Sequence, residues 1–186
     1  MTTNKPELRR HFQALRDGSS PQDRARWSQD ICRHVAALCD ERGFRRIGVF
    51  APFRSEVDLR ALQESDPNLE CFFPRVAGRD PARLAWGPPP LVPGTWGLLE
   101  PAETPFDQPP VQLLLVPGLA FAADGHRLGY GKGFYDGVLA ALPPRVTTLG
   151  VGFELQRCNR LPAGPTDHPV QGLATEAGLT WFRPAR

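Results

Sequence analysis

The sequence predicts a single α/β domain with a mostly parallel sheet covered by helices on both faces. A length of 186 residues with 41% hydrophobic residues suits one compact core. Several short apolar runs lack polar alternation, which is typical of strands buried on both faces. Helical segments lie between several of these runs, as the crossovers of a parallel sheet require. The pattern leaves the strand order open.

Two helices are expected at the start of the chain. The first covers residues 5–16, where apolar residues recur at helical spacing among basic ones. The second begins after Ser20, a favourable N-cap, with Pro21 at the first helical position. Its apolar stripe stops before Gly43, which marks the helix end.

The remaining elements follow from short apolar runs bounded by turn residues. The expected strands are 46–50, 69–73, 111–116 and 147–153, and the expected helices between them are 59–64 and 134–142. Proline is frequent between Ala77 and Gln108, which predicts a long ordered loop or a small hairpin there.

Composition argues against several classes of partner. A net charge of +2 with scattered arginines does not favour nucleic-acid binding. No apolar run reaches the roughly 18 to 20 residues that span a membrane, so we expect a cytoplasmic protein.

The four cysteines form no CxxC pair, which indicates reduced thiols rather than a zinc site. They are Cys32, Cys39, Cys71 and Cys158.

A glycine-rich segment, residues 116–136, leaves one expected strand and ends where a helix begins. Alternating Gly129, Gly131 and Gly133 let the backbone bring its N–H groups close to a ligand. Arg127 and Lys132 add cationic donors, and the helix start adds its positive dipole end. Phosphate is the ligand that these features favour, although the spacing matches neither the Walker motif nor GxGxxG.

The residues alone also allow plainer interpretations. A glycine-rich turn can simply connect a strand to a helix. Asp136 is either a stabilising acid in the first turn of a helix or an anchor for Mg²⁺ beside phosphates. Lys5 and Arg9 are ordinary residues for a solvated helix face.

The run Arg-Leu-Gly-Tyr-Gly-Lys-Gly-Phe-Tyr-Asp at 127–136, preceded by Val-Pro-Gly-Leu-Ala-Phe at 116–121, closely resembles the signature of the 5-formyltetrahydrofolate cyclo-ligase family. The similarity extends over essentially the whole chain, through Lys5–Arg9, Glu56–Asp58, Phe73–Val76, Trp96–Gly97, Asp167 and Thr175–Glu176. It implies a fold like that of sugar-phosphate isomerases and CoA transferases, and a monomer.

The resemblance implies a role for each matching residue. The positions implied for ATP binding are Lys5, Arg9, Arg127, Leu128, Gly129, Tyr130, Gly131, Lys132, Gly133, Phe134 and Tyr135. Those implied for folate binding are Ala51, Glu56, Tyr130 and Phe134. Arg127, Lys132 and Tyr135 are implied to be catalytic, and Asp136 and Asp167 to hold Mg²⁺.

The reaction implied by the resemblance closes 5-formyltetrahydrofolate to 5,10-methenyltetrahydrofolate with Mg-ATP. ATP would phosphorylate the formyl oxygen, and N10 would then attack the activated carbon. Such chemistry needs positioned charges rather than a protein nucleophile. The four histidines are dispersed, and no serine or cysteine lies in a nucleophile motif.

Three departures from the family pattern keep a rival open. Ala122 and Gln171 stand where acids are common, and Thr166 replaces a frequent histidine. A non-catalytic family member that binds nucleotide or folate is therefore the alternative function. A second rival is an α/β enzyme that binds sugar phosphates with the same kind of loop and needs no Mg-ATP.

Overall fold

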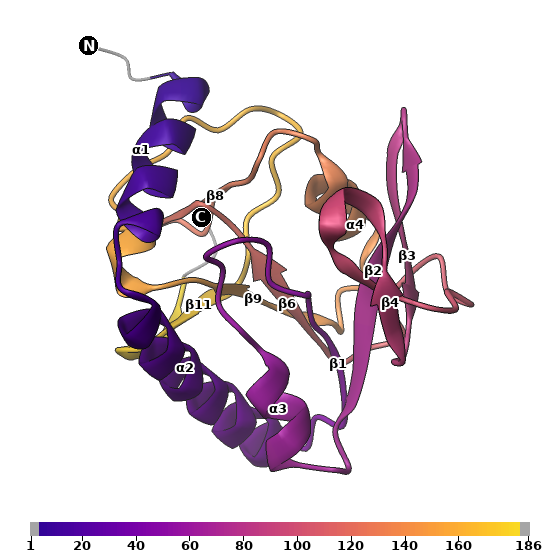
Figure 1. The fold of residues 1–186 in the computed structure, drawn as a ribbon. Helices are drawn as coiled ribbons and strands as arrows, with labels where there is room; N and C mark the ends of the chain where they lie inside the picture. Colours follow the sequence, from indigo (N-terminus) through magenta and orange to yellow (C-terminus); the bar gives the residue numbers. More distant parts are fainter. Residues whose placement is uncertain (1–3, 183–186) are drawn as a thin grey trace.

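The centre of the computed structural model, which describes residues 4–182 and for Ser65 the backbone alone, is a seven-stranded sheet in the order β12-β11-β9-β6-β1-β2-β3 (Figure 1). These strands are β1 Arg46–Gly48, β2 Glu70–Arg79, β3 Ala82–Gly87, β6 Leu113–Pro117, β9 Thr147–Val151, β11 Gly172–Thr175 and β12 Gly178–Trp181. The five inner strands pair in parallel, whereas β3 and β12 run antiparallel at the two edges. The predicted mostly parallel sheet is confirmed.

Four α-helices and several short elements surround the sheet. The helices are α1 Lys5–Asp17, α2 Pro21–Arg42, α3 Arg60–Ser65 and α4 Phe134–Ala141. The short strands are β4 Leu91–Pro93, β5 Leu99–Pro101, β7 Ala120–Ala122, β8 Arg127–Leu128 and β10 Arg157–Cys158, and the 3₁₀ turns are η1 Thr95–Gly97 and η2 Glu154–Gln156. Strands β4 and β5 form a hairpin, and β10, β7 and β8 form a small sheet.

Helices cover both faces of the large sheet, as the uninterrupted apolar runs predict. In β6, Leu113 and Leu115 belong to the core cluster beneath α2 and α3. Leu114 and Val116 point the other way, into the cluster that packs against α4. All four are fully buried, so this strand carries no polar face. Figure 1 shows α2 and α3 on one side of the sheet and α4 on the other.

The helix ends follow the expected capping chemistry. The side chain of Ser20 accepts a hydrogen bond from the backbone N–H of Asp23, and Gly43 ends α2 in the left-handed conformation. Helix α1 is capped by Asn4, whose side chain forms a capping box with Glu7. The predicted bounds of both helices therefore agree with the structure to within one residue.

For the proline-rich region from Ala77 to Gln108, the predicted small hairpin is confirmed, and the alternative of a long loop is not. The region contains β3, which extends the main sheet by pairing with β2, and the β4–β5 hairpin. The prediction ended β2 at Phe73, but the strand continues to Arg79 because Arg79 pairs with Ala82 across a tight turn. Strands β11 and β12 were also missed, since each has only four residues and a glycine weakens its pattern.

The fold also bears on the thiols and on membranes. All four cysteines are free, and three are buried, which raises the pKa of Cys32 and Cys71 to about 12 and that of Cys39 to about 11. The thiols therefore stay protonated at neutral pH. Between residues 4 and 182, no helix is long and apolar enough to cross a membrane.

Candidate active site

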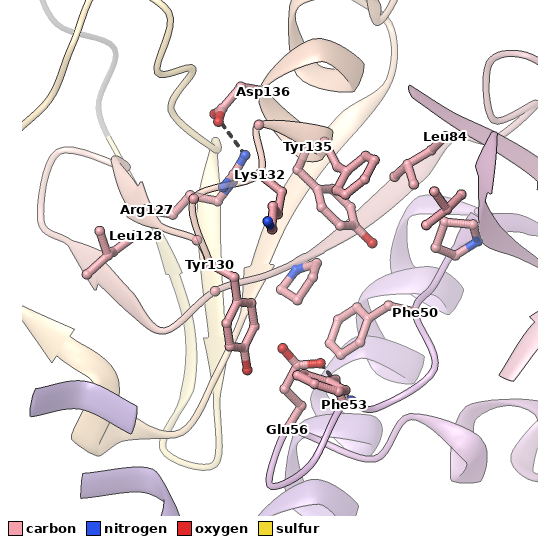
Figure 2. Close-up of a pocket in the computed structure, with 18 of the residues that line it drawn as sticks. Phe50, Phe53, Glu56, Leu84, Arg127, Leu128, Tyr130, Lys132, Tyr135 and Asp136 are labelled. Carbon is pink, nitrogen blue, oxygen red and sulfur yellow. Dashed lines mark hydrogen bonds and ion pairs between the residues drawn. The ribbon is translucent and has the colours of Figure 1, made fainter. Parts of the chain in front are cut away.

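A cleft of about 650 Å³ opens at the carboxyl ends of β1 and β6, between α1, the glycine loop and the β4–β5 hairpin (Figure 2). Ligand sites in α/β proteins commonly lie at this edge of the sheet. Every site residue expected from the sequence lines this cleft: Lys5, Arg9, Ala51, Glu56, Arg127, Leu128, Gly129, Tyr130, Gly131, Lys132, Gly133, Phe134, Tyr135, Asp136 and Asp167. Segments up to 162 residues apart therefore meet at one site.

The glycine loop, residues 127–135, depends on backbone conformations that favour glycine. Gly131 and Gly133 have φ angles of +88° and +74°, where a side chain is strained. A Cβ on Gly131 would also lie 3.0 Å from the guanidinium of Arg9. That guanidinium donates from Nε to the carbonyl oxygen of Gly129 at 2.8 Å. Arg9 thus fixes the loop against α1 and leaves its other donors beside the cleft.

The start of α4 supplies unpaired donors at the same place. Gly133 is its N-cap and provides no side-chain acceptor for the first-turn N–H groups. Lys132, one residue earlier, is exposed and lines the cleft. It has no hydrogen bond or ion pair among the residues that the structure describes. Backbone and side chain together form a site that suits an anion.

Arg127 is a buried cation at the wall of this anion site. Its Nη2 donates to Oδ1 of Asp136 at 2.9 Å, and its guanidinium lies 5.8 Å from the ring centroid of Tyr135. Burial lowers the pKa of Arg127, an effect that Asp136 opposes. Within residues 4–182 its Nε has no hydrogen-bond partner. An unpaired buried donor is costly, so a ligand oxygen at this position would be stabilising.

Asp167 lies across the cleft and is held as a carboxylate. Its Oδ2 accepts from Nζ of Lys5 at 2.5 Å and from the backbone N–H of Gly164 at 2.7 Å. Burial raises the pKa of Asp167, but the hydrogen bonds from Lys5 and Gly164 outweigh it and leave the pKa below its usual value. The group is therefore ionised at neutral pH.

The two carboxylates fit a magnesium ion that is shared with a substrate. In the part of the chain that the structure describes, no cluster of three or more potential ligands could hold a metal by itself. Asp136 and Asp167 nevertheless both line the cleft, and both interact with Arg127. Mg²⁺ is commonly bound by one or two carboxylates, with phosphate oxygens and waters completing its shell. The donor set suits that arrangement.

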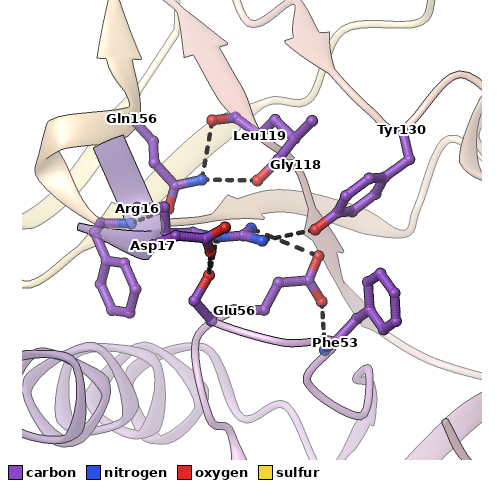
Figure 3. A network of polar contacts seen from close by, with 10 residues as sticks. Arg16, Asp17, Phe53, Glu56, Gly118, Leu119, Tyr130 and Gln156 are labelled. Atoms are coloured by element: carbon purple, nitrogen blue, oxygen red, sulfur yellow. Dashed lines mark hydrogen bonds and ion pairs between the residues drawn. The ribbon is translucent and has the colours of Figure 1, made fainter. Parts of the chain in front are cut away.

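The opposite side of the cleft contains a buried network around Glu56 (Figure 3). Its Oε2 accepts from the backbone N–H of Phe53 at 2.9 Å, and Oε1 lies 3.8 Å from a guanidinium nitrogen of Arg16. The other terminal nitrogen of Arg16 donates to the hydroxyl of Tyr130 at 2.7 Å. Sequence reasoning counted Arg16 only as one of the basic residues of a short helix, and its part in the site was missed.

Burial dominates the titration of these groups. It raises the pKa of Glu56, while the Phe53 N–H, Arg16 and the hydrogen bond from Tyr130 act in the opposite direction. Burial also raises the pKa of both Tyr130 and Tyr135, so these phenols keep their protons and can donate. The hydroxyl of Tyr135 is buried and has no hydrogen-bond partner among the described side chains.

An apolar wall completes the cleft. Its members that sequence reasoning did not select are Phe50, Phe53, Pro74, Val76, Leu84, Trp96, Leu98, Leu99 and Pro117. Several come from the region expected to be a long loop or a small hairpin, and their approach to the glycine loop left no local signal. Trp96 has a φ of +57° and lies edge-on to Phe134, with ring centroids 6.2 Å apart. The wall suits the flat rings of an aromatic ligand.

The three departures from the family pattern have different surroundings. Ala122 is buried in a core cluster below the loop. Gln171 bonds to the backbone of Thr148 between β9 and β11. Thr166 lines the cleft, next to Asp167. Two of the three substitutions therefore lie outside the cleft, which weakens the case for a non-catalytic protein.

Comparison with known proteins agrees with this geometry. A sequence model described as the 5-formyltetrahydrofolate cyclo-ligase family matches residues 1–176. The mouse 5-formyltetrahydrofolate cyclo-ligase is 28% identical, covering 92% of this chain and 91% of its own length. The Mycolicibacterium smegmatis enzyme of the same name is 35% identical, covering 70% and 73%.

Solved structures show the same fold. The NMR structure of Aquifex aeolicus 5,10-methenyltetrahydrofolate synthetase superposes with a TM-score of 0.81 at 32% identity, covering 98% of this chain and 94% of that one. A synthetase of that name from Mycoplasma pneumoniae shares the fold with a TM-score of 0.75 at 20% identity, covering 94% and 99%. The chain is an enzyme of the ligase class and belongs to the 5-formyltetrahydrofolate cyclo-ligase family.

Proposed function

We propose that this protein uses Mg-ATP to cyclise 5-formyltetrahydrofolate to 5,10-methenyltetrahydrofolate, releasing ADP and phosphate. One observation carries the proposal: a single cleft joins a cationic, glycine-lined half to a half with apolar walls and a buried carboxylate. A phosphate chain and a flat heterocycle can therefore lie end to end in it. The names of its relatives specify the folate to test.

The cationic half is assigned to ATP. Lys5 and Arg9 from α1 face the loop of Leu128 to Tyr135, whose N–H groups and Lys132 would bind phosphate oxygens. Asp136 and Asp167 would hold Mg²⁺, which when bound neutralises phosphate charge and favours transfer of the terminal phosphoryl group. Binding would release Lys5 and Arg127 from their carboxylate partners toward the phosphates.

The other half is assigned to the folate. Glu56 would accept two N–H groups of the pterin edge through its carboxylate oxygens, a paired contact that favours correct orientation. Ala51, which follows β1, lines the same cleft, and Tyr130 and Phe134 would pack on the rings. The buried hydroxyl of Tyr135 adds one donor that has no partner among the described side chains.

The chemistry requires activation of an unreactive formyl group. Its oxygen would attack the terminal phosphorus of ATP, forming an O–P bond as the bond to ADP breaks. N10 would then attack the formyl carbon, the phosphorylated oxygen would leave as phosphate, and N10 would lose its proton. Arg127 and Lys132 would stabilise the charge on the transferring group from the two sides of the loop.

The protein would accelerate both steps mainly by alignment. Holding two reactants in a reactive geometry contributes roughly 7 to 11 kcal/mol relative to free encounter. No protein nucleophile is needed, because the leaving group comes from ATP. A cleft whose two halves meet at Tyr130 and Phe134 is suited to this role.

The deciding test is spectroscopic. Purified protein is mixed with 5-formyltetrahydrofolate and Mg-ATP, and the longer-wavelength absorbance band of the methenyl product is followed. Growth of the band only in the complete mixture supports the proposal, with ATP and magnesium omitted in turn. A folded protein that binds nucleotide and gives no band would be a non-catalytic family member.

Two further measurements test the expected assembly and location. Gel filtration tests whether the protein is a monomer, and cell fractionation tests whether it is cytoplasmic.

A further inference from the structure

Arg16 is an unusual residue because its whole side chain is buried, although most of α1 is exposed. The side chains of Arg16 and Glu56 are 1% and 7% exposed. Arg16 donates from Nε to the hydroxyl of Ser55 at 3.0 Å and from Nη2 to Tyr130 at 2.7 Å. Ser55 in turn donates to Asp17. Burying an arginine is costly unless its charge is paired and its N–H groups form hydrogen bonds. Arg16 does both next to the cleft (Figure 3).

Glu56 receives stabilisation from three directions. The backbone N–H of Phe53 comes from its own loop, Arg16 from α1, and the hydroxyl of Tyr130 from the glycine loop. Tyr135 of α4 also faces it, as a neutral phenol. Arg16 is the cation in this set, and it acts twice, directly and through Tyr130, which accepts from Arg16 and hydrogen-bonds Glu56.

We propose that Arg16 is a positioning residue for folate recognition, which holds the carboxylate of Glu56 in place at the cleft through their ion pair and through its hydrogen bond to Tyr130. The inference rests on the proposed function, because it assumes that Glu56 binds the pterin. It adds a residue outside the cleft lining that controls the charge and orientation of one inside it. The N–H groups of a pterin edge need an ionised acceptor with both oxygens available, and a protonated Glu56 would present a donor instead.

The position of Arg16 also gives α1 a second role. Lys5, Arg9 and Arg16 lie at spacings of four and seven, which places them on one face of the helix. The first two line the half of the cleft assigned to ATP, and the third supports the half assigned to folate. One face of α1 thus serves both substrates.

A double-mutant cycle with Arg16→Met and Glu56→Gln separates positioning from packing. Arg16→Met should raise the KM for 5-formyltetrahydrofolate roughly 10-fold, with less than about a 2-fold change in the KM for ATP. In the Glu56→Gln background the same substitution should change the folate KM less than about 2-fold, since there is no carboxylate to hold. Arg10→Met, an exposed change on the same helix, is the matched control.

The pH profile adds a readout that loss of packing would not move. Below the pKa of Glu56 the folate KM should rise as the carboxylate is protonated. Removing Arg16 removes a cation that lowers this pKa, so the rise should begin at higher pH in Arg16→Met. Arg16→Lys retains the charge and should restore most of the wild-type profile. The titratable groups around Glu56 are Arg16 and the phenols Tyr130 and Tyr135. Asp17 is linked to Arg16 through Ser55.

Three outcomes are distinguishable. If wild-type protein forms no methenyl product, the proposed function fails. If the wild type is active but Arg16→Met raises the folate KM equally in the wild-type and Glu56→Gln backgrounds, Arg16 is merely structural and the inference is wrong. If Arg16→Met does not fold, infrared titration of wild type against Glu56→Gln decides: a Glu56 that is protonated at neutral pH overturns the inference, and an ionised one supports it.

Discussion

The half of the cleft proposed for ATP, the phosphate half, and the half proposed for folate, the folate half, would recognise their ligands by different means. In the phosphate half, Lys132 is exposed and unpartnered among the described residues, Lys5 is partly exposed and paired with Asp167, and only Arg127 is a buried cation, paired with Asp136. In the folate half, Arg16 and Glu56 are buried and fixed by hydrogen bonds. The difference suggests that phosphate charge is met by groups that change partners, whereas the heterocycle is met by groups already in place.

The largest effect is expected on the phosphate half. Asp136→Asn should lower kcat about 100-fold, as losses around metal ligands do. The amide retains an oxygen for the Nη2 of Arg127, so Tm should fall much less than activity. Asp124→Asn, an exposed change just before the loop, is the control. Equal kcat in both variants would remove Asp136 from the proposed metal site.

The folate half should respond in KM rather than in kcat. Glu56→Gln should raise the KM for 5-formyltetrahydrofolate about 30-fold, because a hydrogen bond to a charged group contributes roughly 1.5–3 kcal/mol. The KM for ATP should stay close to that of wild type. Glu70→Gln, on the exposed side of β2, controls for the loss of charge. A similar rise in both KM values would contradict the division of the cleft into two halves.

The stability of the same variant tests the burial of Glu56. Its folded pKa lies above the usual 4.5, so the wild type loses stability as pH rises from there through the folded pKa. Glutamine does not titrate. The Tm of Glu56→Gln relative to wild type should therefore increase over this interval. A constant difference from the usual pKa of 4.5 up to neutral pH would mean that folding does not raise the pKa of Glu56.

A smaller effect is expected at the exposed lysine. Lys132→Ala should raise the KM for ATP roughly 10-fold, which corresponds to the loss of about 1.4 kcal/mol of charge-assisted bonding. Since Lys132 has no partner among the described residues, Tm should not change. Arg145→Ala removes the same charge outside the cleft and should change neither quantity. Equal ATP affinities would argue against phosphate binding by the loop.

The smallest effect concerns the loop backbone. Gly131→Ala and Gly43→Ala both place a side chain at positive φ, so both should cost about 1 kcal/mol of stability. Only Gly131 also contacts Arg9, whereas a Cβ on Gly43 meets nothing. The KM for ATP should thus rise about 3-fold for Gly131→Ala alone. Equal effects of both variants would show that the Arg9 contact is unimportant.

The same contrast explains what the sequence could predict. The phosphate half is built mostly from consecutive residues, 127–136, so its glycines and cations can be recognised as one motif in the sequence. The folate half is not: Arg16 becomes buried only because Ser55 and Tyr130, 39 and 114 residues away, fold around it. The sole local hint was its position seven residues after Arg9, on the same helical face. Trp96 and Leu98 were not selected as site residues for the same reason, because nothing in their local sequence shows that they approach the glycine loop.

The ion pair of Lys5 and Asp167 also has a consequence during protein synthesis. These residues are 162 positions apart, so the cleft closes only after most of the chain has left the ribosome. Until then Lys5 of the basic helix has no Asp167 to pair with. A ligand that binds this cleft selects the complete fold, and at 100 times its Kd it would stabilise that fold by about 2.7 kcal/mol. Substrate supply would then influence how much newly made enzyme survives.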